Sequence, residues 1–186
     1  MLLLALAAGT WLALTRHPAK VRELTIFDLD RRDGVLFASG EKEPFNGHLI
    51  ENYTATARKA TVEVHNGKVH GVSRGWYDNG QIEVEETFVE GVSHGTRTRW
   101  HANGARKSVA QIEHGKVVGP YFEWYDNGQK AVQMTLRDGQ PDGLVEAWHR
   151  SGALKSHVRF EQGKQVSREF WPDPVAATAS NSGKSG

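Results

Sequence analysis

The chain of 186 residues contains no cysteine, and neither sign of charge is in excess. The absence of cysteine excludes disulfide bonds, thiolate metal ligands, a cysteine nucleophile and a lipid-modified cysteine. Because 23 basic residues balance 22 acidic ones, the formal net charge is only +1 and the composition carries no electrostatic footprint for nucleic acid. We therefore expect no nucleic-acid partner.

Long hydrophobic stretches are also scarce, with one exception near the N-terminus. Residues 2–14 (LLLALAAGTWLAL) form an apolar run that basic residues follow at once. A membrane-spanning helix needs about 20 apolar residues, so this run has the length of a signal-peptide core, although a basic segment before it and a clear cleavage site are missing. We expect residues 1–22 to form a short hydrophobic helix, either a signal peptide or a membrane anchor. The chain is then exported or membrane-anchored through residues 2–14, and a cytoplasmic location is the alternative.

Glycine, in contrast, is abundant and strictly periodic. Two series repeat every 24 residues: Gly47, Gly71, Gly95, Gly119 and Gly143, and then Gly67, Gly91, Gly115, Gly139 and Gly163. Tryptophan follows the same period at Trp76, Trp100, Trp124 and Trp148. A fixed period without insertions is the signature of a repeat array in which each unit packs on its neighbours. The array is expected to cover residues 47–171.

Each unit reads as a β-hairpin. Two runs of alternating polarity flank an Asn-Gly or Ser-Gly pair, whose glycines are Gly80, Gly104, Gly128 and Gly152. Asn-Gly is the preferred pair of a type I′ turn, in which both central residues have positive φ, so we expect that turn here. The alternation places Val84 and Phe88 on a buried face, and the tryptophans are expected to supply most of the buried area.

The flanking segments deviate from the repeat pattern. Residues 23–46 contain two short apolar runs around Asp33-Gly34 and predict one more, degenerate leading hairpin. Residues 172–186 lack large apolar side chains after Val175 and predict a disordered tail. The predicted fold class is all-β: an elongated array of antiparallel hairpins that forms a twisted, open meander sheet.

The units resemble the bacterial MORN-repeat variants, in particular the YwqK-type antitoxin components. The matching segments are residues 76–81 (WYDNGQ), residues 124–129 (WYDNGQ), the lead-in at residues 44–47 and the Gly-x-x-x-Gly ends such as residues 91–95. The resemblance covers roughly residues 33–163. It implies a non-catalytic β-hairpin array that binds proteins or sits at membranes, in the bacterial cell envelope if the N-terminal prediction is right.

No motif predicts catalysis, a cofactor or a metal site. Nucleotide-binding and nucleophile motifs are missing, and the adjacent carboxylates Glu85 and Glu86 should point to opposite faces of a strand. His65, His70, His94 and His114 lie at or near the turns between hairpins, one or two in each unit. We expect strands to hold these units' histidines apart, whereas a metal needs three or four converging ligands, so we interpret them as polar turn residues.

One repeated position is a candidate binding surface. The residue after each tryptophan is aromatic or imidazole: Tyr77, His101, Tyr125 and His149. Equivalent strands lie roughly 9.5 Å apart, so this ladder could stack sugar rings, or else merely cover the neighbouring strand. We expect a protein-interaction module with an unidentified protein partner, of which an antitoxin-like inhibitor is a special case. The alternative is an envelope protein that binds a glycan or lipid head group through the ladder.

Overall fold

The computed structural model describes residues 21–174. The predicted N-terminal hydrophobic helix and most of the predicted tail lie outside these residues. Within them the chain consists of strands, joined by tight turns, and one short 3-10 helix. None of the described elements is a helix with the length and apolarity that a bilayer crossing requires.

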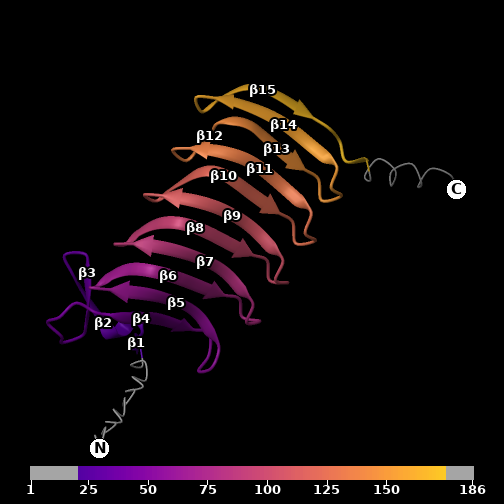
Figure 1. The fold of residues 1–186 in the computed structure, drawn as a ribbon. Helices are drawn as coiled ribbons and strands as arrows, with labels where there is room; N and C mark the ends of the chain where they lie inside the picture. Colours follow the sequence, from indigo (N-terminus) through magenta and orange to yellow (C-terminus); the bar gives the residue numbers. More distant parts are fainter. Residues whose placement is uncertain (1–20, 175–186) are drawn as a thin grey trace, which may run out of the picture.

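The elements follow one another in a simple order (Figure 1). They are β1 (Glu23–Leu24), η1 (Ile26–Asp28), β2 (Leu29–Arg32), β3 (Val35–Ala38), β4 (Gly47–Asn52), β5 (Arg58–His65), β6 (Lys68–Trp76), β7 (Ile82–Val89), β8 (Val92–Trp100), β9 (Arg106–Glu113), β10 (Lys116–Trp124), β11 (Lys130–Arg137), β12 (Gln140–Pro141), β13 (Gly143–Trp148), β14 (Leu154–Glu161) and β15 (Lys164–Phe170).

The strands from β4 to β15 form one antiparallel meander, which confirms the predicted fold class. Each strand pairs with the strand before it and the strand after it, and only the short β12 leaves this path. The strands bend in the same sense and stack into a curved, open sheet whose first and last strands lie far apart (Figure 1). The array is therefore extended, and its units meet only their neighbours.

The second glycine series makes the type I′ turns, and the pairs that end in Gly80, Gly104, Gly128 and Gly152 do not. Within residues 21–174 the non-glycine residues with positive φ are Asp33, Asn66, Glu90, His114, Asp138 and Gln162, and each directly precedes a glycine that also has positive φ. At Glu90-Gly91 the φ angles are 51° and 85°, and Val89 pairs with Val92 across the two-residue loop. Two successive positive φ angles define this turn and suit the twist of the strands.

The Asn-Gly and Ser-Gly pairs that end in Gly80, Gly104, Gly128 and Gly152 form a different turn, so the prediction of type I′ geometry there was wrong. At residues 77–81 only Gly80 has positive φ, at 81°, and its N–H donates to the Tyr77 carbonyl over 3.0 Å. The Tyr77 N–H in turn donates to the Gln81 carbonyl over 2.8 Å. This is the pattern of a three-residue loop, in which a type I turn precedes a left-handed glycine. The same bonds recur at Gly104, Gly128 and Gly152.

The first glycine series marks a bulge in each unit. In β8 the pairing with β7 shifts between Arg97 and Ser93, and Gly95 lies inside this shift with φ of 100°. Equivalent shifts interrupt β6 and β10 next to Gly71 and Gly119. A bulge bends its strand, so its repetition at the same position in successive units accounts for the common curvature of the sheet.

One face of the sheet, which we call the inner face, carries the most buried side chains of the central array. It is defined by Ser108, Ala110 and Ile112 of β9 and by their neighbours across the strands; Ile112 is only 1% exposed. Cross-strand pairing places Val84 on this face, as predicted, but Val84 is only half-buried. Among residues 21–174 the sheet is a single layer, and no second layer of these residues covers this face in the middle of the array. Only small or central side chains are therefore fully buried.

The N-terminal segment closes one end of the array. The hairpin β2–β3 forms a separate two-stranded sheet around the turn Asp33-Gly34, so the predicted hairpin exists but does not extend the main sheet. Ala38 and Phe45 pack on Val64 with surrounding leucines and make the one hydrophobic cluster of this end. The short strand β1 pairs in parallel with β4 at His48 and Leu49 and covers that part of its outer edge. This end of the sheet is therefore capped.

Candidate functional site

The ladder of aromatic and imidazole residues holds successive units together. The Tyr77 hydroxyl donates to the Trp100 carbonyl over 2.9 Å, and the Tyr125 hydroxyl donates to the Trp148 carbonyl over 2.8 Å. The imidazoles do the same: Nε2 of His101 lies 2.8 Å from the Trp124 carbonyl, and Nε2 of His149 lies 2.8 Å from the Trp171 carbonyl. Because a carbonyl only accepts hydrogen bonds, both rings carry their proton on Nε2.

The ladder begins one unit earlier than the sequence suggested. The Tyr53 hydroxyl donates to the Trp76 carbonyl over 2.9 Å. Tyr53 stands 24 residues before Tyr77, so the period alone could have identified it even though its unit lacks the tryptophan and the Asn-Gly pair. Its presence shows that the degenerate first unit is joined to the array by the same bond as the others.

A second ladder of asparagines runs beside the first. The Asn79 amide donates to the Ala102 carbonyl over 2.8 Å, and its oxygen accepts from the Gln81 N–H over 3.0 Å. Asn103 and Asn127 make the same two bonds one and two units further on. The asparagine in the loop of one hairpin therefore hydrogen-bonds to the loop of the next hairpin. This bond explains why asparagine recurs at a position where its φ is not positive.

The polar ends of the predicted ligand ladder are thus engaged within the array. Tyr77 and Tyr125 are half-buried, and burial raises the pKa of the Tyr77 hydroxyl. A ligand could still meet the ring faces, so the binding role predicted for Tyr77, His101, Tyr125 and His149 stays a prediction. Their geometry favours the alternative reading, in which they cover and join neighbouring strands.

The tryptophans of the repeat are half-buried, and their rings contact cations. Lys130 Nζ lies 4.8 Å from the ring centroid of Trp148, and the Arg106 guanidinium lies 5.7 Å from that of Trp124. Phe122 stacks on Trp124 with a centroid distance of 5.9 Å. No repeat tryptophan is among the fully buried core residues of the described chain. The tryptophans are therefore not the most buried positions, and their expected share of the buried area stays a prediction.

A charged cluster lies on the inner face at the middle of the array. Glu86 faces Arg97 across β7 and β8, with 2.6 Å between carboxylate and guanidinium, and the Ser93 hydroxyl also donates to it. Burial raises the pKa of Glu86, but the hydrogen bonds from Arg97 and Ser93 outweigh it and hold that pKa below its usual value. Glu85 points to the other face and pairs with Arg74 over 2.7 Å. The two adjacent carboxylates lie on opposite faces, as predicted.

The last strand, β15, leaves an open edge. Within the described residues it pairs only with β14, and all its side chains are exposed. The Trp171 N–H donates to the Lys155 carbonyl over 2.9 Å, so this residue directs its backbone toward β14. Because strand residues alternate, Glu169 shares that direction, whereas Arg168 and Phe170 direct their N–H and C=O groups away from the sheet. These outward groups can accept another strand.

The position after Trp171 explains why the hairpin pattern stops there. The Trp171 carbonyl accepts the ladder bond from His149 one residue earlier than the 24-residue period predicts, so Pro172 follows it as Tyr77 follows the Trp76 carbonyl. Tyr77 and Tyr125 close the loops of their units by donating an N–H to a glutamine carbonyl. Proline has no N–H and cannot make this bond. Pro172, just after β15, is therefore the residue that prevents this strand from continuing into another hairpin of the same type.

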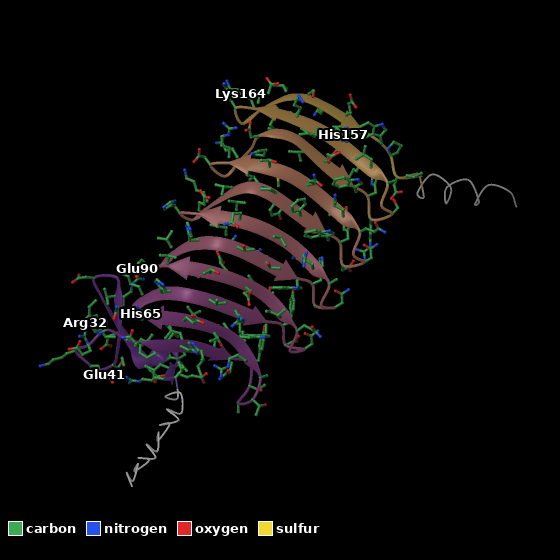
Figure 2. All side chains as sticks on the ribbon, viewed as in Figure 1. Arg32, Glu41, His65, Glu90, His157 and Lys164 are labelled. Carbon is green, nitrogen blue, oxygen red and sulfur yellow. The ribbon has the colours of Figure 1, made fainter. Side chains whose placement is uncertain are left out.

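Histidines gather at the side of the sheet where the type I′ turns lie, as the sequence predicted, but their expected separation was wrong. His65 and His70 have ring centroids 6.0 Å apart, and those of His94 and His114 are 5.6 Å apart. Figure 2 shows His65 and Glu90 at these turn-side ends of the strands. The histidines were expected to be held apart, but short turns and neighbouring strands bring them together in pairs. Within residues 21–174, no group of three or more histidine, aspartate or glutamate side chains is arranged to hold a metal ion.

Comparison with known families agrees with the repeat type. Residues 69–90 match the family described as MORN repeat variant. The matched segment runs from β6 through the three-residue loop to the end of β7, so it is one hairpin of the array. This match supports a MORN-repeat family for the array, and it does not distinguish an antitoxin-like member. No curated protein matches the chain.

Proposed function

We propose that this protein is a protein-interaction module whose partner adds an extended strand to the open edge of β15. The observation that carries the proposal is the asymmetry of the two ends of the sheet. β1 and the β2–β3 hairpin cover the first end, whereas β15 is exposed along its whole length. Natural proteins protect such edges because unpaired backbone groups recruit other strands, so an unprotected edge suits a docking site.

The backbone of β15 supplies the affinity of this docking. The outward N–H and C=O groups of Arg168 and Phe170 are two residues apart and lie in a regular stretch, because β14 and β15 pair without a shift from Ser156 and Phe170 to Arg159 and Ser167. An incoming strand can therefore continue the hydrogen-bond ladder at this edge.

The side chains of β15 supply the specificity. Phe170 and Arg168 pair with Ser156 and Val158, and Phe170 is 62% exposed. A partner strand that places an apolar side chain beside Phe170 and an acidic one beside Arg168 complements both positions. The rings of Trp171 and His157, at a centroid distance of 5.1 Å, border the other face of the same edge.

Replacing Arg168 by proline tests the proposal. Arg168→Pro removes an outward N–H together with the guanidinium that lies over the Phe170 ring, so the backbone and the side-chain contributions to docking are both lost. Proline itself is tolerated on an edge strand whose N–H faces solvent. Affinity capture from the protein's own cells should recover a partner with the wild-type chain and with Arg168→Lys, and lose it with Arg168→Pro. The thermal unfolding of Arg168→Pro should stay close to that of the wild type. Equal recovery of the same partner by all three chains would show that β15 is not the docking edge.

An antitoxin-like inhibitor is a narrower form of this proposal, in which the captured partner is a toxin that the array inactivates. We further propose, from residues 2–14, that the chain is exported or anchored in a membrane. The match to the MORN repeat variant family fits a non-catalytic repeat module, and the lack of enzymatic activity stays a prediction. Fractionation of cells that express the native chain checks the location, and a wholly cytoplasmic chain would contradict export and favour the antitoxin-like form.

A further inference from the structure

We propose that the two histidine pairs, His65 with His70 and His94 with His114, are binding sites for borderline divalent transition metals such as Ni²⁺, Cu²⁺ and Zn²⁺. This inference is independent of the proposed function, because it uses the turn-side ends of β5 to β10 and not the β15 edge. Imidazole is a good ligand for these ions, and each pair is accessible from solvent.

The ring spacing suits a shared ion. Two imidazoles bound to one ion, with metal–nitrogen distances of about 2.0–2.1 Å, have centroids about 5 Å apart at a tetrahedral angle and about 6.4 Å apart when they lie opposite each other. The centroid distances of 6.0 Å and 5.6 Å fall inside this range. Small side-chain rotations are therefore enough to aim one nitrogen of each ring at a common point.

The surroundings of the first pair provide support beyond the two ligands. Nδ1 of His70 lies 3.3 Å from the Glu90 carboxylate, a contact that orients the ring and leaves Nε2 for the ion. Glu90 is itself held by Lys68 over 3.1 Å. A hollow of about 400 Å³ is lined by His65, His70, His48 and Glu63. Since no third ligand is in place within residues 21–174, water or a nearby side chain completes the coordination.

The second pair differs in its environment. His94 and His114 line a smaller hollow of about 270 Å³ together with Val89 and Val92. His94 lies in β8 and His114 in the β9–β10 turn, so an ion here ties two adjacent hairpins together. The first pair spans a single turn, from the last residue of β5 to the third residue of β6.

Titration of the full chain with NiCl₂ tests the proposal, with protein purified without a histidine tag. Isothermal titration calorimetry should show two equivalents of Ni²⁺ for the wild type. His65→Gln and His70→Gln should each lose one equivalent, His94→Gln and His114→Gln should each lose the other, and His65→Gln with His94→Gln should lose both. His157→Gln is the matched control, because His157 pairs with Glu146 over 3.1 Å and lies in neither pair.

Two further measurements identify the ligands and verify the fold of each variant. Electron paramagnetic resonance with Cu²⁺ should report two nitrogen ligands per ion in the wild type and one or none in the variants. Circular dichroism without metal verifies that each variant is folded, and any one folded member of a pair is sufficient to test its site. The proposal is wrong if folded His65→Gln or His70→Gln keeps two equivalents, if His157→Gln loses one, or if the wild type shows no saturable binding.

Discussion

At the scale of single residues, the recurring polar side chains of this protein are structural connectors. Each ladder tyrosine or histidine satisfies a tryptophan carbonyl of the following unit, and each loop asparagine satisfies another carbonyl beside it. A carbonyl at a loop would otherwise rely on water. The repetition of these residues in the sequence is therefore explained by the joints between the units.

Removal of one ladder hydroxyl measures the strength of such a joint. Tyr125→Phe keeps the ring but removes the bond to the Trp148 carbonyl, which should lower the free energy of unfolding by about 1 kcal/mol, the usual net worth of a neutral hydrogen bond. Tyr53→Phe should cost less, because Tyr53 is 42% exposed and water can replace the bond. Urea unfolding followed by circular dichroism measures both. A larger loss in Tyr53→Phe than in Tyr125→Phe would contradict this account.

The inner-face cluster predicts a dependence of stability on pH. Because Arg97 and Ser93 hold the pKa of Glu86 below its value in the unfolded chain, about 4.3, the ionised carboxylate stabilises the fold at neutral pH. This stabilisation is fully present above the unfolded value and is lost as the pH falls through the folded pKa. Glu86→Gln should therefore lower the free energy of unfolding by about 2 kcal/mol at pH 7, and less at acidic pH.

The control for this prediction is the adjacent carboxylate. Glu85→Gln affects an exposed ion pair with Arg74 on the other face, and such pairs contribute about 0.5 kcal/mol. Denaturant unfolding at several pH values compares the two variants. Equal, pH-independent effects would show that the Glu86–Arg97 pair has no special role.

At the scale of the element, the hairpin could be predicted from the sequence, but its turn chemistry could not be predicted completely. The 24-residue period and the alternating polarity were sufficient to place the strands and their faces. A type I′ turn was predicted at Asn79-Gly80 because this pair favours that turn locally. The structure has a three-residue loop there, in which the Asn79 side chain hydrogen-bonds to the next unit. Such a contact between units is invisible to reasoning about one hairpin. The same limit hid the histidine pairs, since register and turn length determine which side chains meet.

The corrected turn assignment predicts a stabilising substitution. Gln162 adopts φ of 50° before Gly163, and asparagine tolerates this left-handed conformation better than glutamine. Gln162→Asn should therefore raise the free energy of unfolding by about 0.5 kcal/mol. Gln165→Asn, in the extended strand β15, is the matched control and should bring no gain. Thermal unfolding of both variants checks the difference, and a gain in Gln165→Asn alone would argue against the turn assignment.

At the scale of the whole molecule, the protein is a one-dimensional stack with two unlike ends. The N-terminal end has a hydrophobic cluster and a parallel strand that cover it, and the C-terminal end has an exposed strand followed by prolines. The sequence predicted the array and its atypical ends, but which end is closed depends on how residues 23–46 fold over β4 and β5. The proposed docking of a partner strand rests on the open edge at β15.

Amide hydrogen exchange of the complex recovered by affinity capture tests the docking of a partner strand at β15 most directly. In the free chain, the N–H groups of Arg168 and Phe170 should exchange rapidly, whereas those of Glu169 and Trp171, which face β14, should exchange more slowly. Binding of the partner should selectively protect Arg168 and Phe170. Unchanged exchange at these two amides in a saturated complex, with protection elsewhere in the array, would contradict the account.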